Sequence, residues 1–76
     1  NPVTQIQYSV ARRTYVRLLV YNILGQIQNV LVEKFCEAGV HTVTWDANSS
    51  GAPSGVYILQ LVADGGVSTK KIVLIK

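Results

Sequence analysis

The spacing of apolar side chains constrains this chain most, because it follows a period of two residues and shows no helical period. Ile6, Tyr8 and Val10 alternate with polar residues, and Val16, Leu18 and Val20 repeat the pattern. Successive side chains of a strand point to opposite faces, so each run predicts a strand with one buried face. Composition agrees, since 12 Val, 6 Ile and 5 Thr make 23 of the 76 residues β-branched, and β-branched residues favour strands.

Turn signals separate these runs and divide the chain into short strands. The strands are predicted over residues 5–10, 15–21, 27–35, 40–45, 56–63 and 67–75. Short strands that recur about every 8 to 12 residues are typical of sandwiches. We therefore expect an all-β fold, an immunoglobulin-like antiparallel β-sandwich of six to seven short strands, forming a single domain over residues 1–76.

Two of the predicted strands carry more specific predictions. In the second strand, Val16, Leu18 and Val20 are assigned to the core, which places Tyr15, Leu19 and Tyr21 on the outer face, where they could form an interface. The consecutive apolar residues 30–32 indicate a bulge or burial on both faces.

Glycine-containing turns are also predicted. Gly25 is expected to supply a positive φ after the second strand. The pair Asp64-Gly65 suits a type I′ hairpin. Residues 46–55 are rich in Asp, Asn, Ser, Gly and Pro, and they are predicted to form the longest loop.

No set of residues indicates catalysis. Cys36, His41 and Asp46 are the candidates for nucleophile and base, but no motif brings them together. His41 is interpreted as a residue at the rim of the core and Cys36 as a buried thiol. A chain of 76 residues also has little room for a deep cleft. We expect no enzyme activity and no cofactor.

The segment from Asp46 to Tyr57 matches a calcium loop only in part. Asp46, Asn48, Ser50 and Gly51 match the first positions of a calcium loop, but the twelfth position is Tyr57, where a bidentate Glu is required. Tyr57 is instead interpreted as a core aromatic residue whose hydroxyl reaches a backbone partner near the loop. No metal site is therefore expected.

The charge of +3 is spread along the chain and does not form the basic, aromatic-lined groove that nucleic acids require. We expect no nucleic-acid partner. The sequence contains no run of 18 apolar residues, so no membrane span is predicted. Methionine is absent, which suggests that the sequence is an excerpt from a larger protein.

Five short motifs follow one another in a fixed order. They are Asn1-Pro2, residues 20–26 (VYNILGQ), residues 38–46 (AGxHxVxWD), residues 54–57 (SGVY) and residues 70–76 (KKIVLIK). In this order they resemble the C-terminal sorting domain of the Por, or type IX, secretion system, type A. The same pattern is similar to the immunoglobulin-like domain of the flagellar hook-capping protein. Val3 departs from the sorting family's pattern, in which Phe commonly follows the opening Asn-Pro.

The resemblance implies a noncatalytic signal that directs a larger cargo protein across the outer membrane. Its implied partners are the outer-membrane translocon, a sortase-like peptidase and the preceding cargo domain. The implied route passes through the periplasm to the cell surface or the extracellular space. The signal maps by position onto seven residues: Gly55, Val56, Tyr57, Lys70, Lys71, Val73 and Lys76.

An alternative interpretation remains open from the sequence. The chain could be a structural or carbohydrate-facing immunoglobulin-like module of a multidomain extracellular protein, and aromatic residues on an outer strand face would favour it.

Overall fold

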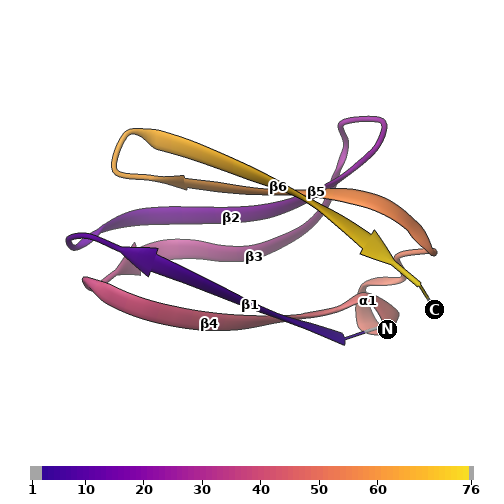
Figure 1. The fold of residues 1–76 in the computed structure, drawn as a ribbon, viewed down its shortest axis with the longest axis horizontal. Coiled ribbons are helices and arrows are strands. Elements are labelled where there is room, and N and C mark those ends of the chain that lie inside the picture. Colours follow the sequence, from indigo (N-terminus) through magenta and orange to yellow (C-terminus); the bar gives the residue numbers. More distant parts are fainter. Residues whose placement is uncertain (1–2, 76) are drawn as a thin grey trace.

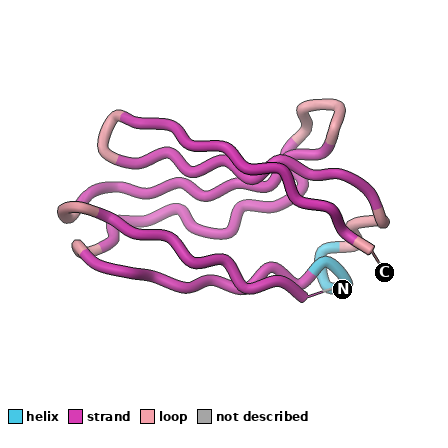
Figure 2. Tube along the Cα trace, viewed as in Figure 1, coloured by secondary structure: helices cyan, strands magenta, loops and turns pink. Residues whose placement is uncertain are grey.

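The computed structural model describes residues 3–75, which form six strands and one short helix (Figure 1). Loops and turns are confined to the two ends of the elongated molecule (Figure 2). The elements in chain order are β1 (Val3–Val10), β2 (Thr14–Asn22), β3 (Ile27–Cys36), β4 (Gly39–Asp46), α1 (Ala47–Ser50), β5 (Gly55–Ala63) and β6 (Gly66–Leu74).

The strands form two antiparallel sheets that lie in two layers (Figure 1). The smaller sheet contains β1 and β4, and the larger sheet has the order β3-β2-β5-β6. Every pair in both sheets is antiparallel. The predicted all-β antiparallel sandwich is confirmed, with six strands.

The core lies between the two sheets. Val16, Leu18 and Val20 are at most 1% exposed, as the alternation predicts. From the smaller sheet, Trp45 reaches into the same core, where its ring meets the ring of Tyr57 edge-on with centroids 5.2 Å apart. Burial of such aromatic and aliphatic side chains is the main stabilising contribution to a small sandwich.

Both predicted turn conformations are present. Asp64 and Gly65 have φ angles of 53° and 76°, and two successive positive φ values are the signature of a type I′ hairpin. Gly25 has a φ of 80° in the turn between β2 and β3. That turn is held by Asn22, whose Oδ1 accepts hydrogen bonds from the backbone N–H groups of Leu24 and Gln26.

The predicted irregularity of the third strand is confirmed. Leu18 pairs with Val32 while Leu19 pairs with Val30, so Leu31 is an extra residue in β3. A second register shift follows between Val20 and Tyr21. Such bulges bend the strand and change which side chains reach the core.

Two predictions need correction. Residues 46–55 do not form an uninterrupted loop, because α1 occupies Ala47–Ser50 and the Asp46 carboxylate caps it by accepting from the Asn48 and Ser49 N–H groups. Leu19 lies on the outer side of β2 but is only 1% exposed, so it is no part of an exposed patch. Its neighbours across that face are Val30 and Gln60.

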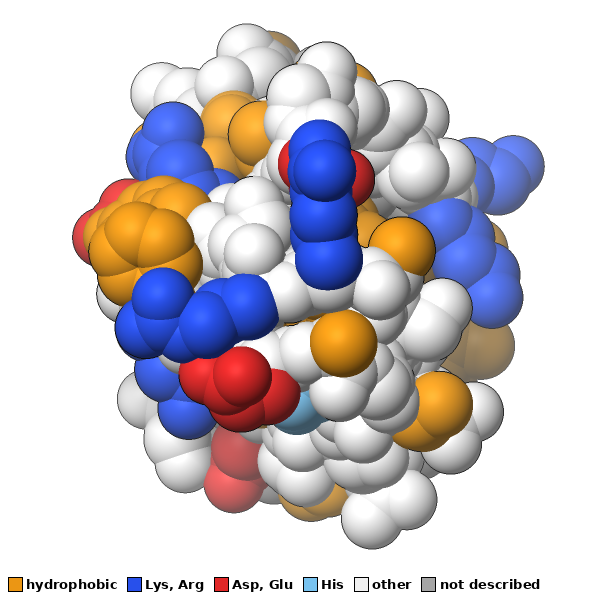
Figure 3. Space-filling model, turned by 90° about the vertical axis from the view of Figure 1, so that its left-hand side faces the viewer, with side chains coloured by type: hydrophobic (Ala, Val, Ile, Leu, Met, Phe, Trp, Pro, Cys, Tyr) orange, Lys and Arg blue, Asp and Glu red, His pale blue; other side chains and the backbone are white. Residues whose placement is uncertain are grey.

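Three arginines at one end of the molecule are neutralised by carboxylates. Figure 3 shows basic and acidic side chains side by side there. The pairs are Arg12 with Asp64 at 2.7 Å, Arg13 with Glu37 at 2.8 Å and Arg17 with Glu33 at 3.1 Å. Within residues 3–75, none of the helical structure is long and apolar enough to cross a membrane.

Candidate functional site

The hairpin of β5 and β6 brings together the two segments that were singled out separately from the sequence. Gly55 pairs with Leu74, Val56 with Val73 and Tyr57 with Ile72. Residues 15 to 19 positions apart in the sequence thus lie side by side where β5 begins and β6 ends. Lys76, the last predicted residue, lies outside the described residues.

The paired residues divide between the two faces of the larger sheet. Tyr57 and Leu74 face the core and are 3% and 2% exposed. Val56 and Val73 face outward and are 38% and 56% exposed. A directly opposed apolar pair on an antiparallel ladder packs side by side. The outer face of this hairpin end is therefore a small apolar surface.

Tyr57 holds the start of β5 in place. Its hydroxyl donates a hydrogen bond to the Pro53 carbonyl, in the turn that precedes the strand. Its ring packs on Trp45, whose Nε1 donates to the Asn29 Oδ1 at 3.0 Å. The prediction of a core aromatic with a backbone partner is confirmed, so Tyr57 shapes this region from within.

Gly55 occupies a backbone conformation that other residues rarely adopt, with a φ of 157°. An added Cβ would meet nothing within 4 Å, so only the backbone conformation disfavours a side chain here.

The two lysines of β6 point to opposite faces. Lys71 pairs with Ile58 on the outer face, whereas Lys70 pairs with Leu59 on the face toward the smaller sheet. Both are exposed, and neither has an ion pair within residues 3–75. Because the three arginines are paired with carboxylates, Lys70 and Lys71 give β6 a net positive charge.

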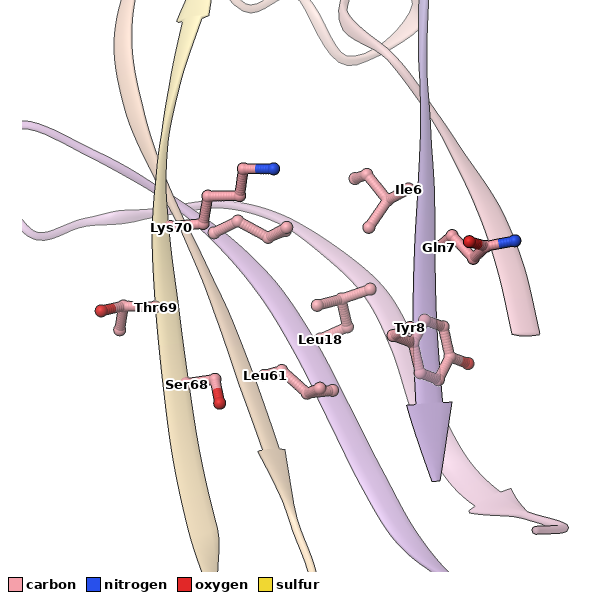
Figure 4. Close-up of a pocket in the computed structure, with 9 residues that line it drawn as sticks. Ile6, Gln7, Tyr8, Leu18, Leu61, Ser68, Thr69 and Lys70 are labelled. Carbon is pink, nitrogen blue, oxygen red and sulfur yellow. The ribbon is translucent and has the colours of Figure 1, made fainter. Parts of the chain in front are cut away.

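The sequence did not reveal that Lys70 faces β1 across an open side of the sandwich. Figure 4 shows Ser68, Thr69 and Lys70 of β6 on one side of a pocket and Ile6, Gln7 and Tyr8 of β1 on the other. The sequence does contain a sign of this open side. One face of β6 carries the apolar residues Ile72 and Leu74 at one end but the polar residues Ser68 and Lys70 at the other.

The candidate catalytic residues make structural contacts. Cys36 is buried, and its Sγ lies 3.7 Å from the Tyr8 hydroxyl. Burial and contact with Cys36 raise the pKa of Tyr8 from 10.0 to about 12. His41 stacks on Tyr8, and its Nε2 lies 2.7 Å from the Glu37 carbonyl oxygen. Asp46 caps α1.

Within residues 3–75, no group of three or more His, Cys, Asp or Glu residues is placed to hold a metal ion. The side chain of Asp46 is already used by the backbone of α1 and by the Ser49 hydroxyl, which donates to it at 3.0 Å.

Comparison with known proteins places the chain in one family. A family described as the secretion system C-terminal sorting domain matches residues 1–76, the whole chain. No curated protein matches the sequence. No solved structure matches it either.

Proposed function

The chain belongs to the secretion system C-terminal sorting domain family and serves as a sorting signal for type IX secretion, and we propose that its recognised surface is the outer face where β5 begins and β6 ends. Export to the cell surface or extracellular space follows from the family. The alternative of a structural or carbohydrate-facing immunoglobulin-like module is not favoured. Sorting domains are noncatalytic in general, and we propose that this chain likewise has no enzyme activity.

One observation carries the proposal: the pairing of Val56 with Val73 joins the two sequence motifs into a single exposed surface. Gly55 and Tyr57 support this surface through backbone conformation and internal packing. The proposal therefore assigns contact with the partner to Val56, Val73 and Lys71, and a positioning role to Gly55 and Tyr57.

The positive charge on the outer face of the hairpin indicates what kind of partner surface would bind there. Lys71 lies on the outer face, has no ion pair within residues 3–75, and is two residues from Val73 on the same face. A partner surface with carboxylates beside an apolar patch would complement it. Lys70 and Lys76 belong to the same basic segment, although Lys70 faces the other sheet.

We assign this partner surface to the outer-membrane translocon. The route would then run through the periplasm, with a sortase-like peptidase acting after the cargo has crossed the outer membrane. These assignments rest on the family and on the chemistry of the exposed hairpin end.

The test is a fusion of residues 1–76 to a reporter that is delivered to the periplasm of a host with a type IX system. Lys71→Glu reverses an exposed charge on the proposed surface. Lys34→Glu is the matched control, because Lys34 in β3 is also exposed and has no ion pair within residues 3–75.

We expect Lys71→Glu to lower reporter export by about tenfold or more, since like-charge contacts oppose association, while Lys34→Glu leaves export unchanged. Circular dichroism and thermal unfolding establish that both variants fold. Equal export of the two folded variants would contradict the proposed surface. Retention of the unsubstituted fusion in the periplasm would contradict the sorting role itself.

A further inference from the structure

A groove runs between the two sheets along one side of the sandwich, between β1 and β6. Three adjoining cavities of about 280, 140 and 300 Å³ make up this groove. Each cavity is lined by residues of both strands. β1 and β6 are edge strands of different sheets and run in opposite directions (Figure 1).

The order of the lining residues shows how the strands face each other. Residues 9–11 of β1 and the adjoining turn lie opposite residues 66–68, residues 6–8 lie opposite 68–70, and residues 4–7 lie opposite 70–72. The groove thus extends along about eight residues, or about 26 Å at the usual rise of a strand.

The floor of the groove is apolar, and one of its residues, Leu61, is incompletely covered. Leu18, Leu59 and Leu61 line it from the larger sheet, and Ile6 lines it from β1 (Figure 4). Leu61 is only half-buried although it belongs to the inner strand β5. The β6 side chain opposite Leu61 is Ser68, which is exposed and too short to cover it.

Side-chain contacts bridge the other side of the sandwich, between β3 and β4. There, Trp45 of β4 donates a hydrogen bond to Asn29 of β3, and His41 of β4 contacts the Glu37 carbonyl in the tight turn that joins these strands. An additional strand would therefore fit on the side between β1 and β6, where the groove lies, and not on the bridged side between β3 and β4.

Backbone groups along the groove are available for pairing. Among the strands of residues 3–75, β1 pairs only with β4 and β6 only with β5. The outer edge of such a strand presents N–H and C=O groups that an added strand can use. The smaller sheet has two strands, whereas sheets of immunoglobulin-type sandwiches usually have three or more.

The charges at the groove indicate which kind of segment would bind there. Lys70 lines two of the three cavities and lies on the strand face toward the smaller sheet, whereas the Lys71 side chain belongs to the outer face. At the opposite end, Asp64 is already paired with Arg12. A second copy of this chain would bring further lysines to the groove, so an acidic segment complements it better.

We propose that the groove accepts one extended, acidic segment of a partner protein. The segment pairs with the free edge of β1 as a third strand of the smaller sheet. Apolar side chains of the segment cover Leu61, and a carboxylate lies beside Lys70. This site is separate from the outer face of the hairpin, and its test requires no export machinery.

The test uses the whole chain and synthetic peptides about eight residues long, the length of the groove. The first peptide alternates Val and Thr and carries one Asp. A control peptide has the same composition with its Val residues grouped, which removes the two-residue period. A third peptide carries Lys in place of Asp. Fluorescence anisotropy measures binding, and amide hydrogen exchange locates it.

We expect the alternating acidic peptide to bind, with new protection of β1 amides, and the grouped peptide to bind at least about tenfold more weakly. Lys70→Glu should reverse the preference, so that the Lys peptide binds more tightly than the Asp peptide. Lys70 is exposed, and thermal unfolding establishes that this variant folds.

Several results of the peptide experiments would overturn the proposal. These are an absence of binding by the alternating peptide up to about 1 mM, equal binding of the grouped peptide, protection located away from β1, and a preference that Lys70→Glu leaves unchanged. Concentration-dependent dimerisation that protects the same β1 amides would also overturn it, since the occupant would then be a second copy.

Discussion

The substitution Tyr57→Phe separates a structural role of this residue from direct recognition. It removes one hydroxyl group and leaves the ring, which is 3% exposed and meets Trp45 edge-on. The lost interaction is the hydrogen bond to the Pro53 carbonyl. Pro53 is exposed, so water can replace the hydroxyl, and no buried acceptor is left without a partner.

The expected cost is therefore that of one ordinary hydrogen bond, about 1 kcal/mol. For a domain of this size, that cost lowers the midpoint of thermal unfolding by roughly 4 to 8 °C. Total stability at about 0.05 to 0.15 kcal/mol per residue is roughly 4 to 11 kcal/mol, so the variant remains folded. Tyr57→Ala removes the whole ring and costs about 3 to 5 kcal/mol, which approaches the entire stability.

Thermal unfolding of residues 1–76 and export of the reporter fusion are measured on the same variants. We expect Tyr57→Phe to unfold at the lower midpoint and to be exported as well as the unsubstituted chain, because a partner cannot reach a buried side chain. We expect Tyr57→Ala to lose export together with its fold. Loss of export by Tyr57→Phe without loss of folding would refute this reasoning, and an unchanged midpoint would refute the stabilising role of the hydrogen bond.

Two further predictions concern the backbone and the pH dependence of stability. Gly55→Ala should lower the free energy of unfolding by about 1 kcal/mol or more, because the φ of 157° disfavours a side chain. Gly66 has no positive φ, so Gly66→Ala should lower the free energy of unfolding by less in the same denaturant titration. The pKa of Tyr8 is raised on folding, so its protonated form stabilises the fold fully below about pH 10, and this contribution is lost as the pH rises toward 12. The free energy of unfolding of the unsubstituted chain should therefore fall more steeply over that range than that of Tyr8→Phe, and parallel curves would show that Tyr8 does not titrate in this way.

Much of the fold could be predicted from local pattern. The alternation of Val16, Leu18 and Val20 predicted both the strand and its buried face, because strand geometry alone decides which side chains share a face. The turn at Asp64-Gly65 followed from the same kind of local preference, since few residues tolerate two successive positive φ values. The burial of Tyr57 and its backbone partner were also predicted correctly.

Leu19 shows the limit of this reasoning. The period of two assigned it correctly to the outer side of β2, but it does not report how closely neighbouring strands cover that side. The capped turn of α1 was missed for a related reason. Asp, Asn, Ser and Gly favour both loops and helix ends, so the segment beginning at Asp46 was compatible with either.

The sequence by itself determined the strands, the inward faces of the first, second and fourth strands, the two hairpin-type turns and, through its motifs, the family. Only the tertiary structure decided that Val56 lies beside Val73, that Lys70 and Lys71 face opposite sides, and that β1 and β6 flank an open groove. The physical reason is the range of the forces involved. Backbone conformation and alternation act between near neighbours in the chain, whereas surfaces and grooves arise where strands distant in the chain pair or fail to pair.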